Sequence, residues 1–494
     1  MYPDRLSSFV PQVSAQPRHL RVLAALVLGA LVGACVVAEP LVGPYLPDLF
    51  RWRQISGILP FAYSLGLLAL VALACAAWVA RDWVFARRFE IATILLVATT
   101  PFEGLNAGQL KASGAALIIV AFFYCMVICI ETPPFRTPLP VLVAVIGLAA
   151  LFFSSIINGM VPSIIAQYSH WNKLVLVLLV TNIVTTPHRL TLALRCLVAA
   201  ATFCALFAIV SQAIFALWGI PITFDPRPEY QFKSTPFGTF LRATAFFTNT
   251  QGLAHMLLIG LGASLFVPMR TWLRWLLVPM MVAAIFCTIN ITAVLIAMVV
   301  LMAYPMVRHP RRIPFYLGFA GLAVGLAYVA GLFDHLQRMF LAMSGDNVND
   351  RVEYARYALE AIIRHPLLGH GLKNIDRLSP APIHNAYLQM AADIGLIGGA
   401  IFAGLIVYLI VGSLRLSATA TPVGRDCARA VFLALFPLAT QFLFEPYYDN
   451  YLSWLLIGLA ATHIGRARRT TPINVQQRRR TALGEETARG GRSC

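Results

Sequence analysis

Long apolar runs recur along almost the whole chain, and they constrain its fold more than any other feature. A helix needs about 20 apolar residues to cross a bilayer. Charged residues make up only 12% of the 494 positions, too few to coat a water-soluble protein of this size. The sequence therefore predicts an all-α polytopic membrane protein with about twelve to fourteen transmembrane helices. The runs lie near 22–38, 56–80, 89–102, 112–131, 138–157, 171–187, 190–219, 246–267, 273–289, 291–307, 314–333, 395–415, 429–446 and 450–465.

Basic residues are concentrated in alternate connections between these runs and at the C-terminus. The net charge of +17 therefore reflects the positive-inside rule and membrane-lipid contact, and we expect no nucleic-acid partner. This pattern predicts a cytoplasmic N-terminal segment at 1–21, an integral membrane domain at 22–465 and a basic cytoplasmic tail at 466–494. The basic connections contain Arg81, Arg87, Arg88, His188, Arg189, Arg270, Arg274, Arg308, Arg311, Arg312, Arg415, Arg425 and Arg429.

Two large polar loops fall on the opposite, outward side. They are 220–245 and 334–394, and the second precedes the last three predicted spans. Water-requiring chemistry has few other places in so apolar a chain. We therefore expect the loop 334–394 to carry the reaction.

The run from Trp275 to Tyr304 can form one long tilted span or two short helices. Two helices meeting at Asn290 keep the alternation of the other loops, so the sequence favours them. We expect the polar side chain at such a break to satisfy backbone groups.

A helix with a capped start is predicted inside the large loop. Asp350 followed by Glu353 fits a capping arrangement, and His365-Pro366 marks the end of the helix. Arg351 would then lie in the first turn, where free backbone N–H groups and a guanidinium together suit a phosphate. The alternative is that Arg351 pairs with Asp350 or with lipid headgroups. The apolar face of this helix would hold Val352, Ala355, Leu359 and Ile362.

Two further residues are candidates for the same chemistry. His384 precedes a predicted helix over 385–393, where the helix dipole disfavours an imidazolium and leaves a base for a sugar hydroxyl. Arg242 lies at the membrane edge, where it could reach a lipid phosphate. Each has a structural alternative: a packed histidine, and an arginine snorkelling to the interface.

These residues stand in motifs that resemble the bacterial O-antigen ligase and polymerase superfamily. The motifs are Arg351 with Tyr354, His-Pro-Leu-x-Gly-x-Gly at 365–371, His384-Asn385-x-x-Leu388, Gly395-x-x-Gly398 and the stretch from Arg242 through Asn249 to Ala254. The resemblance implies an inverting, metal-independent glycosyltransferase of GT-C type in the bacterial inner membrane, with a periplasmic active site. Its donor would be a glycan on undecaprenyl diphosphate, and its acceptor lipid A-core or a growing glycan.

The resemblance also implies roles for single residues. Arg242 and Arg351 would hold the donor diphosphate, and His384 would orient or deprotonate the acceptor hydroxyl. Asn249 and Asn385 would support them. Such roles agree with the chemistry, because a diphosphate leaving group gains charge and an attacking hydroxyl needs a base.

Two positions depart from the family pattern. The mid-chain Thr-x-Ser-Arg motif corresponds to 287–292, which contains no arginine. Asn249-Thr250-Gln251, which has no proline and ends in Gln251, stands where the family shows Asn-Pro-Asn. Other cations can substitute, and the candidates are Arg338, Arg356 and Lys373. We expect no metal and no cofactor, because His365, His370, Asp376 and His384 do not have the spacing of a compact ligand set.

Four functions fit a chain of this kind. A ligase onto lipid A-core is favoured, and a polymerase of O-antigen or exopolysaccharide uses the same donor. A transporter of the lipid-linked glycan would place charged residues at mid-membrane, whereas the ionisable residues here gather at edges and in loops. A non-catalytic scaffold would not require His384 and the arginines to converge.

Overall fold

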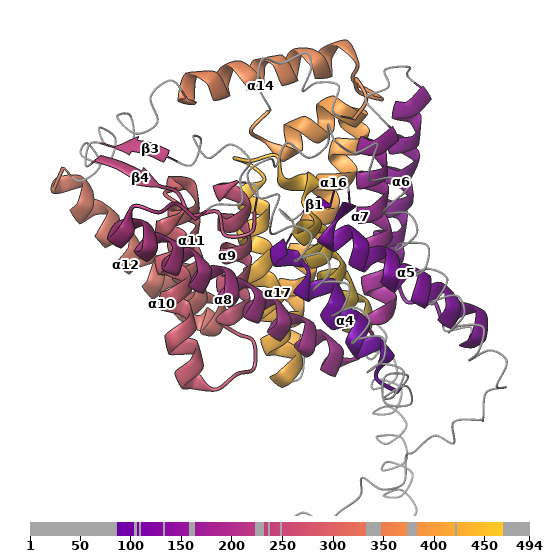
Figure 1. Ribbon diagram of the computed structural model, residues 1–494, viewed down its shortest axis with the longest axis horizontal. Coiled ribbons are helices and arrows are strands. Elements are labelled where there is room, and N and C mark those ends of the chain that lie inside the picture. The colour runs from indigo at the N-terminus through magenta and orange to yellow at the C-terminus, as the bar shows by residue number, and fades with distance from the viewer. Residues whose placement is uncertain are drawn as a thin grey trace, which may run out of the picture. The chain divides into compact units, whose positions relative to one another are not determined.

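The computed structural model describes most of the chain from residue 86 onward (Figure 1). All described residues belong to the second of two compact units, Phe85–Cys494. The described residues do not include the predicted segment 1–21 or the predicted runs 22–38 and 56–80. Of the predicted tail they include only residues 466 and 467, which continue the last helix. The described ranges are 86–102, 106–107, 110–131, 134–157, 164–222, 232–235, 238–247, 249–331, 347–372, 383–419 and 422–467.

Helices make up most of the described chain, and each predicted apolar run within it contains a helix. The helices are α4 (Arg88–Ala98), α5 (Ala112–Glu131), α6 (Leu139–Ile157), α7 (Ile164–Ile183), α8 (Pro187–Trp218), α9 (Thr250–Ser264), α10 (Thr271–Cys287), α11 (Ile291–Arg308), α12 (Ile313–Val329), α14 (Asn347–Arg364), α16 (Ala386–Thr419), α17 (Pro422–Gln441) and a last helix over 451–467. Short 3-10 turns occur at Thr100–Phe102, Pro310–Arg312 and Tyr447–Asp449.

Two small antiparallel hairpins complete the described secondary structure. Strands β1 (Asn106–Ala107) and β2 (Leu110–Lys111) form the first hairpin. Strands β3 (Phe232–Thr235) and β4 (Gly238–Leu241) form the second, with Phe232 opposite Leu241. The second hairpin follows α8 and leads the chain to Arg242.

Three helices are long and apolar enough to cross a membrane: Pro187–Trp218, Ile291–Arg308 and Ala386–Ala418. Ala116–Cys129, Leu139–Phe153 and Thr271–Cys287 are shorter apolar helices. Large apolar side chains are exposed on several helices, for example Trp275 at 77% and Val329 at 85%. Such exposure suits lipid rather than water. These findings favour a membrane protein, and the number of spans stays a prediction.

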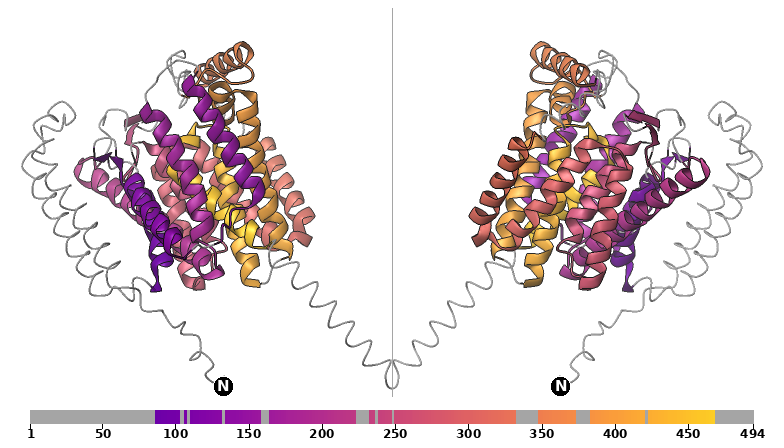
Figure 2. Two further views of the ribbon diagram at one scale, coloured as in Figure 1. Left: turned by 90° about the vertical axis from the view of Figure 1, so that its right-hand side faces the viewer. Right: turned by 90° about the vertical axis from the view of Figure 1, so that its left-hand side faces the viewer.

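The helices lie side by side, and α14 lies across one end of them (Figures 1 and 2). Arginines gather at the other end, where α8, the α9–α10 connection and α17 meet. There Arg195 Nε donates to the Pro268 carbonyl at 3.0 Å, and the Arg429 guanidinium lies 5.5 Å from the Phe266 ring centroid. Arg195 and Arg429 therefore lie at the end of the bundle away from α14, and the orientation of the bundle in a membrane stays a prediction.

The predicted break at Asn290 is confirmed. Helix α10 ends at Cys287 and α11 begins at Ile291, with Asn290 as the N-cap between them. The Asn290 side chain accepts the N–H of Ala293 at 3.1 Å, so it satisfies the backbone as expected. This break gives the Arg242 segment a place to bind, because the N–H of Ala243 donates to the Cys287 carbonyl at 3.0 Å.

The predicted start of α14 is wrong. The helix begins at Asn347, one turn before the predicted cap at Asp350, and it ends at Arg364 as predicted. Arg351 is therefore inside the helix, where its backbone N–H can bond within the helix, and it does not lie among the free N–H groups of the first turn. The face of α14 that packs against α16 overlaps only partly with the predicted apolar face. Ala358, Ala361 and Ile362 are buried against α16, whereas Val352 and Leu359 are exposed.

The turn over 365–371 fastens α14 to a kink in α16. Backbone N–H groups of His370 and Gly371 donate to the carbonyls of Ala392 and Asp393, at 2.9 and 2.8 Å. Helix α16 is interrupted at Ile394 and Gly395, where the Leu396 N–H reaches back to the Pro366 carbonyl at 2.8 Å. The first part of α16 is thus a short helix leading into a span, as predicted.

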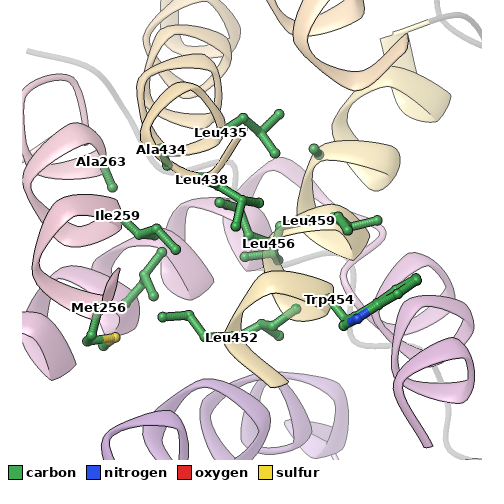
Figure 3. Close-up of a cluster of buried hydrophobic side chains, with 14 of the residues drawn as sticks. Met256, Ile259, Ala263, Ala434, Leu435, Leu438, Leu452, Trp454, Leu456 and Leu459 are labelled. Atoms are coloured by element: carbon green, nitrogen blue, oxygen red, sulfur yellow. The ribbon is translucent and has the colours of Figure 1, made fainter. Parts of the chain in front are cut away.

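One part of the extended hydrophobic core lies between α9, α17 and the last helix (Figure 3). Met256 and Ile259 of α9 contribute to it, together with Leu438 of α17 and Leu452 of the last helix, and all four are fully buried. Gly262 lets α9 and α17 approach closely, since a Cβ there would lie 1.9 Å from the Leu433 carbonyl oxygen. This packing fixes the position of the connection after α17.

Candidate functional site

The connection between α17 and the last helix places one carboxylate among side chains from three other segments. Only 4% of the Glu445 side chain is exposed. Its Oε1 accepts from Arg351 Nη2 at 3.4 Å and from Gln251 Nε2 at 3.3 Å. Its Oε2 lies 3.3 Å from His384 Nδ1. Glu445 therefore joins residues that are as far apart in the chain as Gln251 and His384.

Arg351 reaches this carboxylate from α14. Its Nη1 also donates to the Phe444 carbonyl at 3.4 Å, and 36% of its side chain is exposed. Residues three and seven positions further on, Tyr354 and Ala358, share its face of the helix. Ala358 packs against α16, and the Tyr354 ring centroid lies 6.4 Å from that of His384. The same face of α14 therefore packs against α16 and brings Arg351 to Glu445.

His384 lies just before α16 and is held by its neighbour. Asn385 caps α16 by accepting the Leu388 N–H at 3.0 Å, and it donates to the Leu443 carbonyl at 3.2 Å. An ionised carboxylate can only accept, so the hydrogen shared with Glu445 belongs to His384 Nδ1. Nε2 is then the acceptor of the ring. Because 27% of the side chain is exposed, a substrate hydroxyl can approach it.

Arg242 interacts electrostatically with the same carboxylate from the break between α10 and α11. Its Nε donates to the Thr288 carbonyl at 3.3 Å. Burial lowers the pKa of Arg242, and the negative charge of Glu445 opposes that effect. An arginine stays charged even so. Arg242 and Arg351 thus carry two positive charges against the one negative charge of Glu445, which leaves an excess that suits an anion.

Two hydrogen bonds hold the Asn249 side chain in place. Its Oδ1 accepts the Gly252 N–H at 2.7 Å as the N-cap of α9, and it accepts the Tyr447 hydroxyl at 3.1 Å. The Tyr447 hydroxyl also lies 3.5 Å from Gln251 Oε1. Asn249 and Asn385 therefore hold helix ends in place around the carboxylate, and neither side chain bonds it.

Of the candidates for a third cation, the structure describes Arg356 alone, and Arg356 does not join this group. Arg356 is exposed, and it lies five positions after Arg351, on a different face of α14. Lys373 and Arg338 lie outside the described residues, as does Asp376. In the described ranges, no three His, Cys, Asp or Glu side chains are close enough to hold a metal ion together.

Sequence reasoning missed Glu445, Gln251 and Tyr447 as members of the site. In the sequence Glu445 lies at the end of the apolar run 429–446, and Gln251 is only a departure from a family motif. A signal was nevertheless present, because a carboxylate between two apolar helices is costly to bury and therefore points to a partner. The partner itself could not be identified from the sequence, because it lies on another helix.

Comparison with known families gives a match in the region of the site. Residues 238–403 match the family model described as O-antigen ligase, Wzy_C. This range contains Arg242, Arg351 and His384, and it ends before Glu445. A comparison with curated proteins finds no match.

Proposed function

We propose that this chain, whose residues 238–403 belong to the O-antigen ligase family, transfers a glycan from undecaprenyl diphosphate to lipid A-core oligosaccharide. The observation that carries the proposal is the convergence of Arg351 and His384 on one buried carboxylate, which also interacts electrostatically with Arg242. A scaffold without chemistry would not require this arrangement. We further propose that the reaction inverts the anomeric centre and needs no metal.

The two arginines would act on the donor. The bond between the anomeric carbon and the diphosphate oxygen breaks, and the leaving diphosphate gains negative charge. Arg242 and Arg351 would stabilise that charge, since guanidinium groups bind phosphate oxygens in pairs. The excess positive charge around Glu445 supports this role.

His384 would act on the acceptor. The acceptor hydroxyl oxygen forms the new bond to the anomeric carbon, and its proton passes to His384 Nε2. General-base catalysis of this kind contributes about 10²- to 10⁴-fold in rate. A single displacement with the hydroxyl opposite the leaving group inverts the anomeric configuration.

The charge distribution suggests where the reaction takes place. The arginine-rich end of the helices would face the cytoplasm, and the end with α14 and Glu445 would face the periplasm. A carrier lipid in the outer leaflet of the inner membrane would then present its diphosphate near Arg242 and Arg351. Both chain termini would be cytoplasmic.

A polymerase is the alternative, because it uses the same donor chemistry and differs only in the acceptor. A surface-polysaccharide gel from a deletion strain separates the two. Loss of all long chains from lipid A-core, with carrier-linked polymer accumulating, indicates a ligase, whereas a single repeat unit on lipid A-core indicates a polymerase.

The His384→Ala variant tests the reaction itself. It should remain in the membrane at wild-type level, as a blot of membrane fractions would verify, and should lower transfer by about 10²-fold or more. Transfer at a near-normal rate in this variant would remove His384 from the mechanism.

A further inference from the structure

We propose that Glu445 is a positioning residue that holds His384 throughout the reaction and holds Arg351 only until the donor binds. This inference rests on the proposed function. It concerns a residue outside the region that matches the O-antigen ligase family. The geometry points to two separate tasks for the two carboxylate oxygens.

Each carboxylate oxygen of Glu445 contacts a different residue that acts in the proposed reaction. Oε1 accepts from Arg351 Nη2 and from Gln251 Nε2, and Oε2 contacts His384 Nδ1. Loss of the Arg351 contact at Oε1 therefore leaves the His384 contact at Oε2 in place. After Arg351 turns away, Gln251 still donates to Oε1, so the buried carboxylate keeps a partner on both oxygens.

The Arg351 contact is suited to exchange. At 3.4 Å it is longer than the roughly 2.8 Å of a strong charge-assisted hydrogen bond. Over a third of the Arg351 side chain is exposed, so a ligand can reach it. A diphosphate offers paired oxygens that match the guanidinium better than one carboxylate oxygen does. Donor binding would then draw Arg351 from Glu445 to the phosphate.

The connection that carries Glu445 is firmly held, so the carboxylate cannot follow Arg351. The Glu445 N–H donates to the Gln441 carbonyl at 2.9 Å. The Tyr447 ring stacks on His255 with centroids 5.2 Å apart, and Trp454 Nε1 donates to the Tyr448 carbonyl at 2.6 Å. The backbone before and after Glu445 is thus held by these contacts.

Once Arg351 has turned to the donor, Glu445 keeps its contact with His384. A carboxylate on Nδ1 keeps the imidazole in one tautomer and stabilises the imidazolium that forms when Nε2 takes a proton. Glu445 would therefore act on the chemical step, through His384, and only weakly on donor affinity.

The test compares turnover and donor KM in purified variants. The probes are undecaprenyl-diphosphate-linked glycan extracted from the deletion strain and lipid A-core from the same cells. Glu445→Gln keeps the side-chain shape and removes the charge. We expect kcat to fall by about tenfold or more, with donor KM unchanged or lower, because Arg351 is released rather than removed. A damaged fold would instead reduce the yield of monodisperse protein.

Two further variants sharpen the result. Glu445→Asp keeps the charge at a shorter reach, and its kcat should lie between those of Glu445→Gln and the wild type. It also tests the proposal if Glu445→Gln does not fold. Glu360→Gln is the matched control, since it removes a carboxylate whose side chain is 62% exposed on α14 and pairs only with Arg364 in the described residues. It should behave as the wild type.

Several outcomes would overturn the inference. One is a Glu445→Gln variant with wild-type kcat, and another is a loss that appears only as a higher donor KM. A wild-type kcat in Glu445→Asp would count against it equally if Glu445→Gln does not fold. If His384→Ala loses transfer while the Glu445 variants keep it, the proposed function stands and only the role of Glu445 fails. If the wild-type protein transfers no glycan, the proposed function fails and the inference falls with it.

Discussion

Arg351 and Arg356 stand five residues apart on one helix and face different surroundings. Arg351 contacts Glu445 and the Phe444 carbonyl, whereas Arg356 is exposed on another face of α14. Both are arginines near the predicted first turn, so the sequence offers each as a phosphate ligand. The tertiary structure separates them, because only one face of α14 packs against α16.

This difference predicts unequal effects of the same substitution. Arg351→Lys keeps the charge and loses the paired N–H geometry, so donor KM should rise by about tenfold. Arg356→Lys should leave donor KM within about twofold of the wild type. Both values come from transfer assays at varied donor concentration. Equal losses in the two variants would contradict the placement of Arg351 at the donor.

At the scale of elements, the site depends on how α14 is fastened to α16. Gly395 has a φ of 77°, and a Cβ there would lie 2.0 Å from the Leu367 carbonyl oxygen. The motif Gly395-x-x-Gly398 thus has a structural reason, since Gly395 allows the kink in α16 to touch the turn over 365–371. A side chain at 395 would push α14, and with it Arg351, away from Glu445.

The Gly395→Ala variant should therefore lose stability and activity together. Strain in the left-handed region alone costs about 1–3 kcal/mol, and the clash adds to it. Gly404→Ala is the matched control on the same helix, because a Cβ at 404 meets no atom within 4 Å. It should be neutral or slightly stabilising. Thermal melts in detergent compare the two, and an unchanged Tm for Gly395→Ala would refute the clash.

The sequence predicted elements better than it predicted the site. Apolar runs located the helices because they are local patterns, and the alternation of charged connections along the chain located the break at Asn290. The start of α14 was placed one turn late, since a capping pattern at Asp350 occurs inside a longer helix. Glu445 was missed because its partners come from α9, α14 and the segment before α16. Convergence of distant segments has no local signature.

At the scale of the whole molecule, the two ends of the helices should face opposite sides of the membrane. Arg312 lies at the arginine-rich end, and Glu360 lies on α14 at the other. With the nine native cysteines replaced, Glu360→Cys should react with a membrane-impermeant maleimide in spheroplasts. Arg312→Cys should react only after lysis. Reaction of both in intact spheroplasts would disprove the proposed orientation.

The site is also assembled from both halves of the described chain, with its central carboxylate supplied last. Arg242, Arg351 and His384 all precede the final two helices, and Glu445 lies between those helices. During translation, the two arginines and His384 would therefore reach the membrane before Glu445, the residue that joins them. A product cut short after α16 would lack Glu445, so its Arg351 and His384 would have no carboxylate between them.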